Sequence, residues 1–255
     1  MFKEERIPDD IDLPEIIFED EQILVVNKPA GLSTQAPRVI DSLELRVRAY
    51  LQKIVNADLQ TWQGETDDEA PPVYLGLPHR LDRPVSGVIV FAKTKKAARK
   101  ISRQFELRRV DKLYWAIVSG RVSPAEGTWE NHLMKVPDEA HVNVVDASNP
   151  LGQRSVLHYR TLSSDEHSSL LEIDTETGRM HQIRVQAACR GWPIFGDEQY
   201  GSKVAFGKQF ADVRLRAIAL HARQISFEHP TTKERVTYNA PVSDSWRQLG
   251  IDLIA

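Results

Sequence analysis

Cysteine is almost absent from this chain, which has a single one, Cys189, in 255 residues. One thiol can form no disulfide within the chain and supplies no multi-cysteine metal site. No stretch approaches the roughly 20 apolar residues that a membrane span needs, and the N-terminal segment MFKEERIPDDIDLPE lacks the apolar core of a secretion signal. We therefore expect a soluble, cytoplasmic protein without a membrane contact.

Several motifs of well-known enzyme classes are missing as well. The sequence has no Gly-rich phosphate loop, no dinucleotide-binding fingerprint and no G-x-S-x-G nucleophile elbow. His79, His181 and His221 lack the spacing of a metal-binding pair, so no metal site is expected. These absences leave nucleotide hydrolysis, serine-hydrolase chemistry and metal catalysis without support from the sequence.

The chain also has little excess of acidic over basic residues, with a net charge of only −3. The distribution is nevertheless uneven. Residues 1–70 contain 7 Lys/Arg and 16 Asp/Glu, whereas residues 79–121 contain 12 and 3. A focused basic segment attracts a polyanion more strongly than the total charge indicates. Charge alone leaves two interpretations open, a nucleic-acid contact or a solvated charged face.

The apolar patterns predict an acidic lead-in over residues 1–15 and one α+β domain over residues 16–255. Strand-like runs outnumber helices, which interrupt them irregularly, so a mixed sheet is expected rather than a βαβ alternation. The predicted strands are 16–19, 23–27, 87–94, 112–120, 156–162 and 169–175, with a hairpin in 225–241. The predicted helices are 43–55, 94–109 with Thr94 as N-cap, and one within 179–191. Residues 64–72 are expected to form an exposed loop.

The stretch HRLDRPVSG, residues 79–87, places one carboxylate, Asp82, between Arg80 and Arg83. Leu81 precedes it, and a proline turn and a buried strand follow, so the side chain is held at the rim of a sheet. Two arginines favour the ionised form, and a positioned carboxylate can act as a nucleophile or a base. The alternative is an ion pair that only fixes a loop.

A second polar cluster, TGRMHQIR at 177–184, brings Arg179, His181 and Arg184 to a strand-to-helix junction. Arginines at a helix start attract anions, although an exposed basic helix end is the simpler interpretation. Tyr114 lies in an otherwise apolar strand, where it is either a core tyrosine or a ring that faces a ligand.

Together these segments resemble the RluA family of RNA pseudouridine synthases. The resemblance covers residues 16 to 241 and depends on segments in the family's order. They are ILVVNKPAGL (23–32), HRLDRPVSGVIVFAKT (79–94), KLYWAIVSG (112–120), TGRMHQIRVQAACRGWPIFGDEQYG (177–201) and LHARQISFEHPTTKE (220–234). The resemblance implies a curved, mixed, mainly antiparallel sheet flanked by helices and loops, with the active site in a central cleft.

The resemblance also implies roles for four residues. Asp82 matches the catalytic aspartate, and Arg184 the basic residue that pairs with it. Tyr114 matches the tyrosine that packs on the uracil and is placed for proton removal. Arg80 matches the arginine that fills the gap left by the flipped base. Isomerising uridine involves no redox change, so no cofactor is expected. Asp82 could attack C1′ of the ribose, add to the base, or deprotonate C2′, and the sequence does not choose among these.

The expected partner is structured RNA, ribosomal or transfer, bound by a monomer without an obligate protein partner. The candidate RNA contacts are the basic and imidazole side chains around the two motifs and on the basic segment: His79, Arg83, Arg179, His181, Lys95, Lys96, Arg99, Arg103, Arg108 and Arg109. Many relatives carry an S4 RNA-binding domain, for which the lead-in leaves no room. RNA selection is therefore expected from loops such as 33–78 and 121–153.

Two other functions remain as alternatives. A non-catalytic RNA-binding module could keep the fold, but it would be expected to lose the aspartate or the tyrosine. A glycoside or nucleoside hydrolase could use Asp82, but that chemistry usually needs two carboxylates at the site, and neither motif supplies a second.

Overall fold

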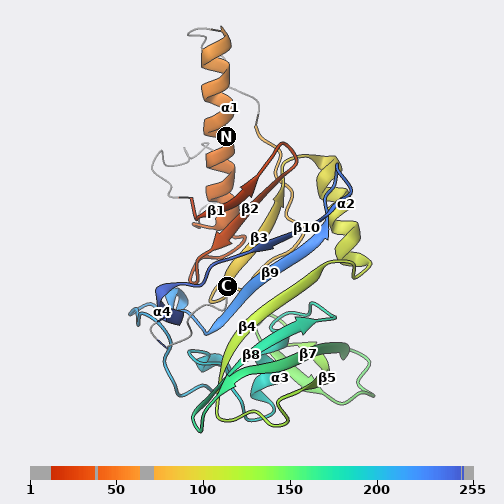
Figure 1. Cartoon of the computed structure of the whole chain (residues 1–255), viewed down its shortest axis with the longest axis vertical. Coiled ribbons are helices and arrows are strands. Elements are labelled where there is room, and N and C mark those ends of the chain that lie inside the picture. Colours follow the sequence, from red (N-terminus) through yellow and green to blue (C-terminus); the bar gives the residue numbers. More distant parts are fainter. Residues whose placement is uncertain (1–12, 38–39, 64–71, 248, 250–255) are drawn as a thin grey trace.

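The computed structural model describes residues 13–37, 40–63, 72–247 and 249. Most of the acidic lead-in and residues 64–71 of the predicted loop lie outside these ranges. Figure 1 shows one sheet that extends from β1 and β2 beside α1 to β5 beside α3. The site described below lies in the middle of this sheet.

Ten strands form the sheet in the described part of the chain. Their order is β1-β2-β3-β9-β4-β8-β7-β5-β6, and β10 pairs with β9. All pairings are antiparallel except that of β3 with β9, which confirms the α+β, mainly antiparallel prediction. The strands are β1 (Ile16–Glu19), β2 (Ile23–Lys28), β3 (Ser86–Ala92), β4 (Asp111–Ser119), β5 (Glu126–Lys135), β6 (Val142–Val145), β7 (Gln153–Ser164), β8 (Ser168–Thr175), β9 (Leu220–Glu228) and β10 (Arg235–Asn239).

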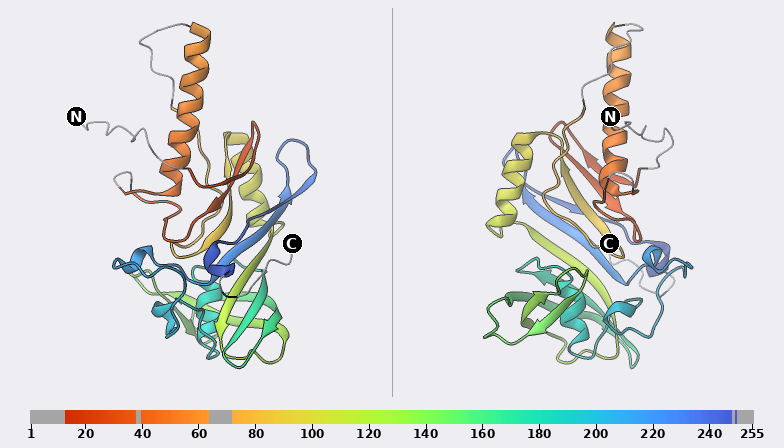
Figure 2. Two further views of the ribbon diagram at one scale, coloured as in Figure 1. Left: turned by 60° about the vertical axis from the view of Figure 1, so that its left-hand side comes forward. Right: turned by 180° about the vertical axis from the view of Figure 1, so that it is seen from behind.

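The helices flank this sheet. They are α1 (Leu43–Gln63), α2 (Lys95–Glu106), α3 (Gln182–Ala188) and α4 (Asp244–Arg247), with single 3₁₀ turns at Glu198–Tyr200 and Val213–Leu215. Thr94 caps α2 as predicted, because its hydroxyl accepts a hydrogen bond from the Ala97 amide. The first helix is longer than predicted, and it extends away from the sheet (Figure 2).

Residues 121–153 were predicted to be a loop. They also contain β5, β6 and the first residue of β7, so this prediction was wrong in part. The buried positions of β5 are Trp129 and Leu133, four residues apart. Strict alternation is the sequence signature of a half-buried strand. Because β5 lacks it, the pattern gave no strand signal.

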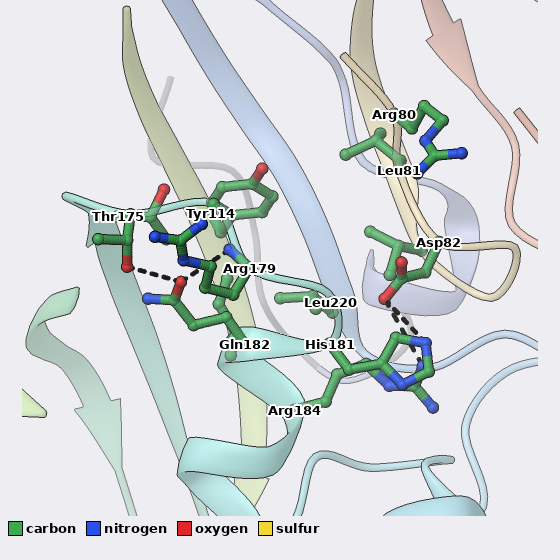
Figure 3. Close-up of a pocket in the computed structure, with 14 residues that line it drawn as sticks. Arg80, Leu81, Asp82, Tyr114, Thr175, Arg179, His181, Gln182, Arg184 and Leu220 are labelled. Atoms are coloured by element: carbon green, nitrogen blue, oxygen red, sulfur yellow. Dashed lines mark hydrogen bonds and ion pairs between the residues drawn. The ribbon is translucent and has the colours of Figure 1, made fainter. Parts of the chain in front are cut away.

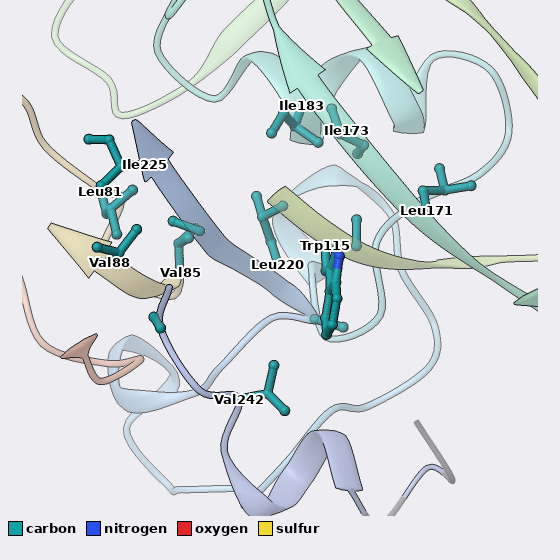
Figure 4. Packing of buried hydrophobic residues seen from close by; sticks show 14 of the residues in the cluster. Leu81, Val85, Val88, Trp115, Leu171, Ile173, Ile183, Leu220, Ile225 and Val242 are labelled. Carbon is teal, nitrogen blue, oxygen red and sulfur yellow. The ribbon is translucent and has the colours of Figure 1, made fainter. Parts of the chain in front are cut away.

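The strand β3 fixes the position of the HRLDRPVSG loop. Val88 and Val90 pack on one side of β3 with Trp115, whereas Ile89 and Phe91 pack on the other side with α1. A strand buried on both faces explains the uninterrupted apolar run. The loop itself is anchored because Leu81 and Val85 enter the same core, as Figure 4 shows.

Gly87 allows β3 to meet β9 closely. Its φ is +121°, and a Cβ built there would lie 2.3 Å from the Ala222 carbonyl oxygen. Only glycine adopts this backbone conformation without strain. The contact brings the start of β3, and therefore Asp82, against the centre of the sheet.

Candidate active site

A cavity of about 100 Å³ lies where four segments meet: the loop before β3, β4, the end of β8 and the start of α3. Figure 3 shows Arg80, Leu81 and Asp82 on one side, and Tyr114, Thr175, Arg179 and Gln182 on the other. A second hollow of about 630 Å³ shares Arg80, Leu81, Asp82, Gly178 and Arg179 with this cavity. The two form one cleft, whose outer part is lined by residues 33–35 and 138–140.

Asp82 faces this cleft with 31 % of its side chain exposed. Its Oδ2 lies 3.6 Å from Arg184 Nη1 and 3.7 Å from His181 Nε2. Tyr114 lines the same cavity from β4. The structure thus brings together Asp82, Tyr114 and Arg184, the three residues predicted to be catalytic.

Arg184 is buried and held by Asp197, a residue that the sequence analysis did not single out. Its Nε and Nη2 donate to the two Asp197 carboxylate oxygens at 2.7 and 2.8 Å, and Nη2 also donates to Gln199 Oε1 at 2.8 Å. The guanidinium lies 5.0 Å from the centre of the Tyr200 ring. Burial opposes the charge of Arg184, but the hydrogen bonds and charge of Asp197 raise its pKa overall. A fixed cation therefore points its remaining Nη1 at Asp82.

His181 has a hydrogen-bonded tautomer that suits Asp82. The Tyr200 hydroxyl oxygen accepts a hydrogen bond from the Val142 amide at 3.0 Å and lies 2.9 Å from His181 Nδ1. We assign the hydroxyl as the donor to Nδ1, the tautomer that leaves the proton of a neutral imidazole on Nε2, facing Asp82. Burial lowers the pKa of His181, although the Asp82 charge opposes this. The ring is therefore neutral at pH 7.

Tyr114 keeps its phenol protonated. Burial raises its pKa, and the Asp82 charge raises it further. Its hydroxyl has no hydrogen-bond partner among the side chains and backbone groups that the structure describes. The hydroxyl is therefore available to a molecule in the cavity, and the ring offers a flat apolar surface.

The other predicted contacts differ in their surroundings. Arg80 and Arg179 are exposed where the cavity joins the outer cleft. The Nε of Arg83 donates to Ser33 Oγ at 2.7 Å, which fixes the 79–85 loop to the segment after β2. Arg80 and Arg179 are thus accessible to a polyanion, whereas the Arg83 guanidinium is already hydrogen-bonded to Ser33.

His79 makes packing contacts within the protein, and its predicted role as an RNA contact stays a prediction. Its Nε2 accepts a hydrogen bond from the Val90 amide at 3.0 Å, and its ring stacks on Phe105 at 4.8 Å. Burial lowers the pKa of His79 to about 3. This neutral, partly buried imidazole, whose Nε2 acceptor is already used, fixes the loop to α2.

The basic segment does not form one surface beside the cavity. Lys95 and Lys96 follow the end of β3 that is farther from Asp82, and seven strand residues span roughly 20 Å. Arg108, beyond the other end of α2, pairs with Glu176 at 3.2 Å beside the cavity residues Thr175 and Thr177. Within the segment, Lys95, Lys96, Arg99, Arg103, Arg108 and Arg109 are exposed.

Lys28 is a further residue that the sequence analysis missed. It is fully buried, and its Nζ donates to the carbonyls of Pro29, Leu32 and Arg83 at 2.9, 2.7 and 3.2 Å. Burial lowers its pKa to about 7, although the Asp82 charge opposes this. A lysine at the end of an apolar strand was the available signal, since lysine is rarely buried without partners.

The described residues contain no group of three or more His, Cys, Asp or Glu side chains that could hold a metal ion. None of the helices in the described ranges is long and apolar enough to cross a membrane. The prediction of a metal-free, cofactor-free reaction stays a prediction.

Comparisons with known proteins agree with this geometry. The family described as RNA pseudouridylate synthase matches residues 22–189. The chain is 33 % identical to ribosomal large subunit pseudouridine synthase D of Zymomonas mobilis, over 95 % of this chain and 73 % of that protein. It is 34 % identical to the uncharacterized RNA pseudouridine synthase YhcT of Bacillus subtilis, over 92 % and 70 %.

The solved structures agree as well. Human RNA pseudouridylate synthase domain containing 4 aligns over 94 % of each chain, with a TM-score of 0.67 and 25 % identity. The residues matched by the family include Asp82 in the loop before β3, Tyr114 on β4 and Arg184 on α3. Since both the sequence match and the structural match span the site, the chain belongs to the RNA pseudouridylate synthase family.

Proposed function

We propose that Asp82 is the carboxylate that carries out the isomerisation of uridine to pseudouridine in RNA, the reaction of this family. The observation that carries the proposal is the placement of its Oδ2 between Arg184 Nη1 and His181 Nε2, in a cavity lined by Tyr114. Both neighbours present nitrogen atoms to the carboxylate within ion-pair distance. An ionised oxygen in a cavity is a nucleophile or a base.

The reaction breaks the bond between C1′ and N1, turns the uracil and joins C1′ to C5. The proton on C5 is lost and N1 gains one, so atoms and charge balance without an oxidant or reductant. Asp82 acts by attack at C1′, by addition to the base or by deprotonation at C2′. Each route needs the same carboxylate, held against the ribose and shielded from water.

The uridine must leave its helix to reach the cavity, which costs a few kcal/mol. We assign the Tyr114 ring to stacking on the extruded uracil, and its hydroxyl to the proton that moves at the base. Arg80, exposed at the cavity entrance, is the side chain that takes the vacated position in the RNA stack. Arginine suits this role because its planar guanidinium stacks on bases.

The substrate that we favour is ribosomal large-subunit RNA. This follows the names of several relatives, among them synthase D of Zymomonas mobilis and synthase C of Vibrio parahaemolyticus. The matches to these two cover more than 90 % of the present chain. We further propose that the enzyme acts as a monomer in the cytoplasm.

A hydrolytic function is less well supported. A glycosidase-type reaction usually needs a second carboxylate at the site. Asp197 shares Arg184 with Asp82, but it is 1 % exposed and Arg184 occupies both its oxygens. It is therefore not free to donate a proton to a leaving group.

The test is pseudouridine mapping of total RNA from cells with and without the gene. We expect one or more positions in large-subunit RNA to lose the modification. Wild-type enzyme should restore them, and the Asp82→Asn variant should not. Loss confined to transfer RNA would overturn the proposed substrate, and restoration by Asp82→Asn would overturn the role of Asp82.

A further inference from the structure

Lys112 lies on the cavity side of β4, beside the proposed site. Alternation along the strand places it on the same face as Tyr114, two residues away. Its Nζ is 3.7 Å from the point where a Cβ on Gly178 would stand, and Gly178 lines both hollows of the cleft. The ammonium group therefore lies next to Gly178, a residue of the cleft wall, on the Tyr114 side of β4.

This ammonium has no hydrogen bond and no ion pair within the described residues. The carboxylates whose charge reaches it are Asp174 and Asp111. Asp111 is one residue before Lys112, and Asp174 is paired with Leu113. Both therefore start on the opposite face of the sheet from Lys112 and Tyr114. Among the described residues, no carboxylate on its own face forms an ion pair with Lys112.

Lys112 is held there at a cost to folding. Burial lowers its pKa, the charges of Asp174 and Asp111 oppose this in part, and the Arg108 charge adds to it. A desolvated cation that is not hydrogen-bonded to a counter-ion destabilises the folded state. Packing alone would be served equally well by an uncharged side chain of the same length.

Gly178 keeps the space in front of the ammonium open. Any side chain at this position would place a carbon 3.7 Å from Nζ, within the volume that an anion bonded to Nζ would occupy. Arg108, whose side chain is 55 % exposed and pairs with Glu176, is a second cation nearby.

We propose that Lys112 is a phosphate-binding residue, which takes the backbone phosphate adjacent to the target uridine and so fixes the extruded nucleotide against Tyr114. The ligand is a phosphodiester of the RNA strand. This inference rests on the proposed function, because it requires RNA in the cleft. It assigns Lys112 to positioning of the substrate and not to the bond changes.

The test compares Lys112→Met, Lys112→Arg and Gly178→Ala with wild-type enzyme. The RNA is large-subunit ribosomal RNA from cells that lack the gene, labelled with tritium at C5 of uridine. Release of tritium as C5 is joined to C1′ gives kcat and KM, and filter binding at several salt concentrations gives the salt dependence of affinity. Lys53→Met, on the exposed face of α1, is the matched control.

For Lys112→Met we expect KM to rise about tenfold or more, as for a lost charge-assisted bond, with kcat within about threefold. The slope of log affinity against log salt should fall by about one, the contribution of one phosphate. The melting temperature should stay the same or rise. Lys112→Arg should keep the slope, Gly178→Ala should raise KM to a smaller degree, and Lys53→Met should behave as wild type.

An unchanged slope and KM in Lys112→Met would overturn the proposal, as would a lowered melting temperature with a normal slope. A large loss of kcat with normal binding would also overturn it, because Lys112 would then act in the chemistry. The proposed function fails separately, if Asp82→Asn stays active. The salt slope does not require turnover, so the two failures can be told apart.

Discussion

The two sides of the cleft are held by different kinds of interaction. On the Asp82 side, hydrogen bonds to the main chain hold the loop: Thr34 Oγ1 donates to the Leu81 carbonyl at 2.7 Å and accepts from its amide at 3.1 Å, and the Gly31 amide donates to the Arg83 carbonyl at 2.8 Å. On the other side, Arg184 is held by the charge of Asp197. One side positions a backbone, and the other positions a charge.

This difference indicates how each side fails. Main-chain bonds set where the Asp82 carboxylate stands, so their loss displaces it. The buried ion pair sets the field that Asp82 meets, so its loss changes the carboxylate's reactivity and also leaves a buried charge without a partner. Substitutions on the two sides should therefore separate stability from catalysis in different ways.

The largest effect is expected for Arg184→Met. It leaves Asp197 buried without a partner, which should cost about 3–5 kcal/mol of unfolding free energy. It should also lower kcat by about 100-fold or more, as for loss of a preorganised charge. Denaturant unfolding and tritium release measure the two effects.

The double variant Arg184→Met with Asp197→Asn is the control for this prediction. Removing the unpaired charge should restore part of the stability but none of the activity. If activity returned together with stability, Arg184 would serve the fold alone.

Lys28→Met tests the Asp82 side and its pH dependence. The pKa of Lys28 is about 7 in the folded state, against 10.5 for an ordinary lysine. Between these values the unfolded chain binds more protons, so wild-type stability should rise with pH from about 7 to 10.5. The rise contributed by this group is a few kcal/mol.

In Lys28→Met the slope of stability against pH in this range should be smaller than in wild-type enzyme, although the variant is less stable at every pH because three carbonyls lose a donor. Thermal unfolding at pH 7, 8.5 and 10 measures both slopes. Parallel slopes would show that the pKa of Lys28 is not lowered in the folded protein.

Tyr200→Phe should have a moderate effect. It removes the hydroxyl that donates to His181 Nδ1 but keeps the ring beside Arg184. Without this bond to the neutral imidazole the pKa of His181 should rise, so activity should begin to fall at a higher pH on the acid side. We expect kcat at pH 7 to drop several-fold. If the acid side of the pH–activity profile matched that of wild type, the protonation state of His181 would not affect activity.

The smallest effect is expected for Lys95→Ala combined with Lys96→Ala, at the end of α2 farther from Asp82. If both contact phosphates, the salt slope of binding falls by about two while kcat stays unchanged. We expect this outcome, and an unchanged slope would place the start of α2 outside the RNA footprint.

The same comparison explains what the sequence could predict. Asp82 and its neighbours lie within nine consecutive residues, so the sequence offered a positioned carboxylate as one interpretation beside an ion pair that fixes a loop. Tyr114, a polar ring in an apolar strand, was left open between a core tyrosine and a ring that faces a ligand. These features are local, and the resemblance to a family connected them.

The missed features depend on contacts between distant segments. The partner of Arg184 is Asp197, which follows α3 and a turn, and no periodic pattern links the two. Lys28 was missed because lysine is rarely buried. Two of its acceptors, the Pro29 and Leu32 carbonyls, are local, but the third, the Arg83 carbonyl, is reached only when β2 and the 79–85 loop meet. For His79, the charged motif suggested a contact with RNA, and the packing of its ring on α2 could not be predicted from the sequence.

The most direct measurement of the central claim is tritium release from C5-labelled RNA by Asp82→Asn, beside filter binding of the same RNA. The side chain keeps its size and loses its charge. We predict that turnover falls by at least about 1,000-fold, as for loss of a catalytic group, while affinity for RNA changes little. Turnover within tenfold of wild type would contradict the account.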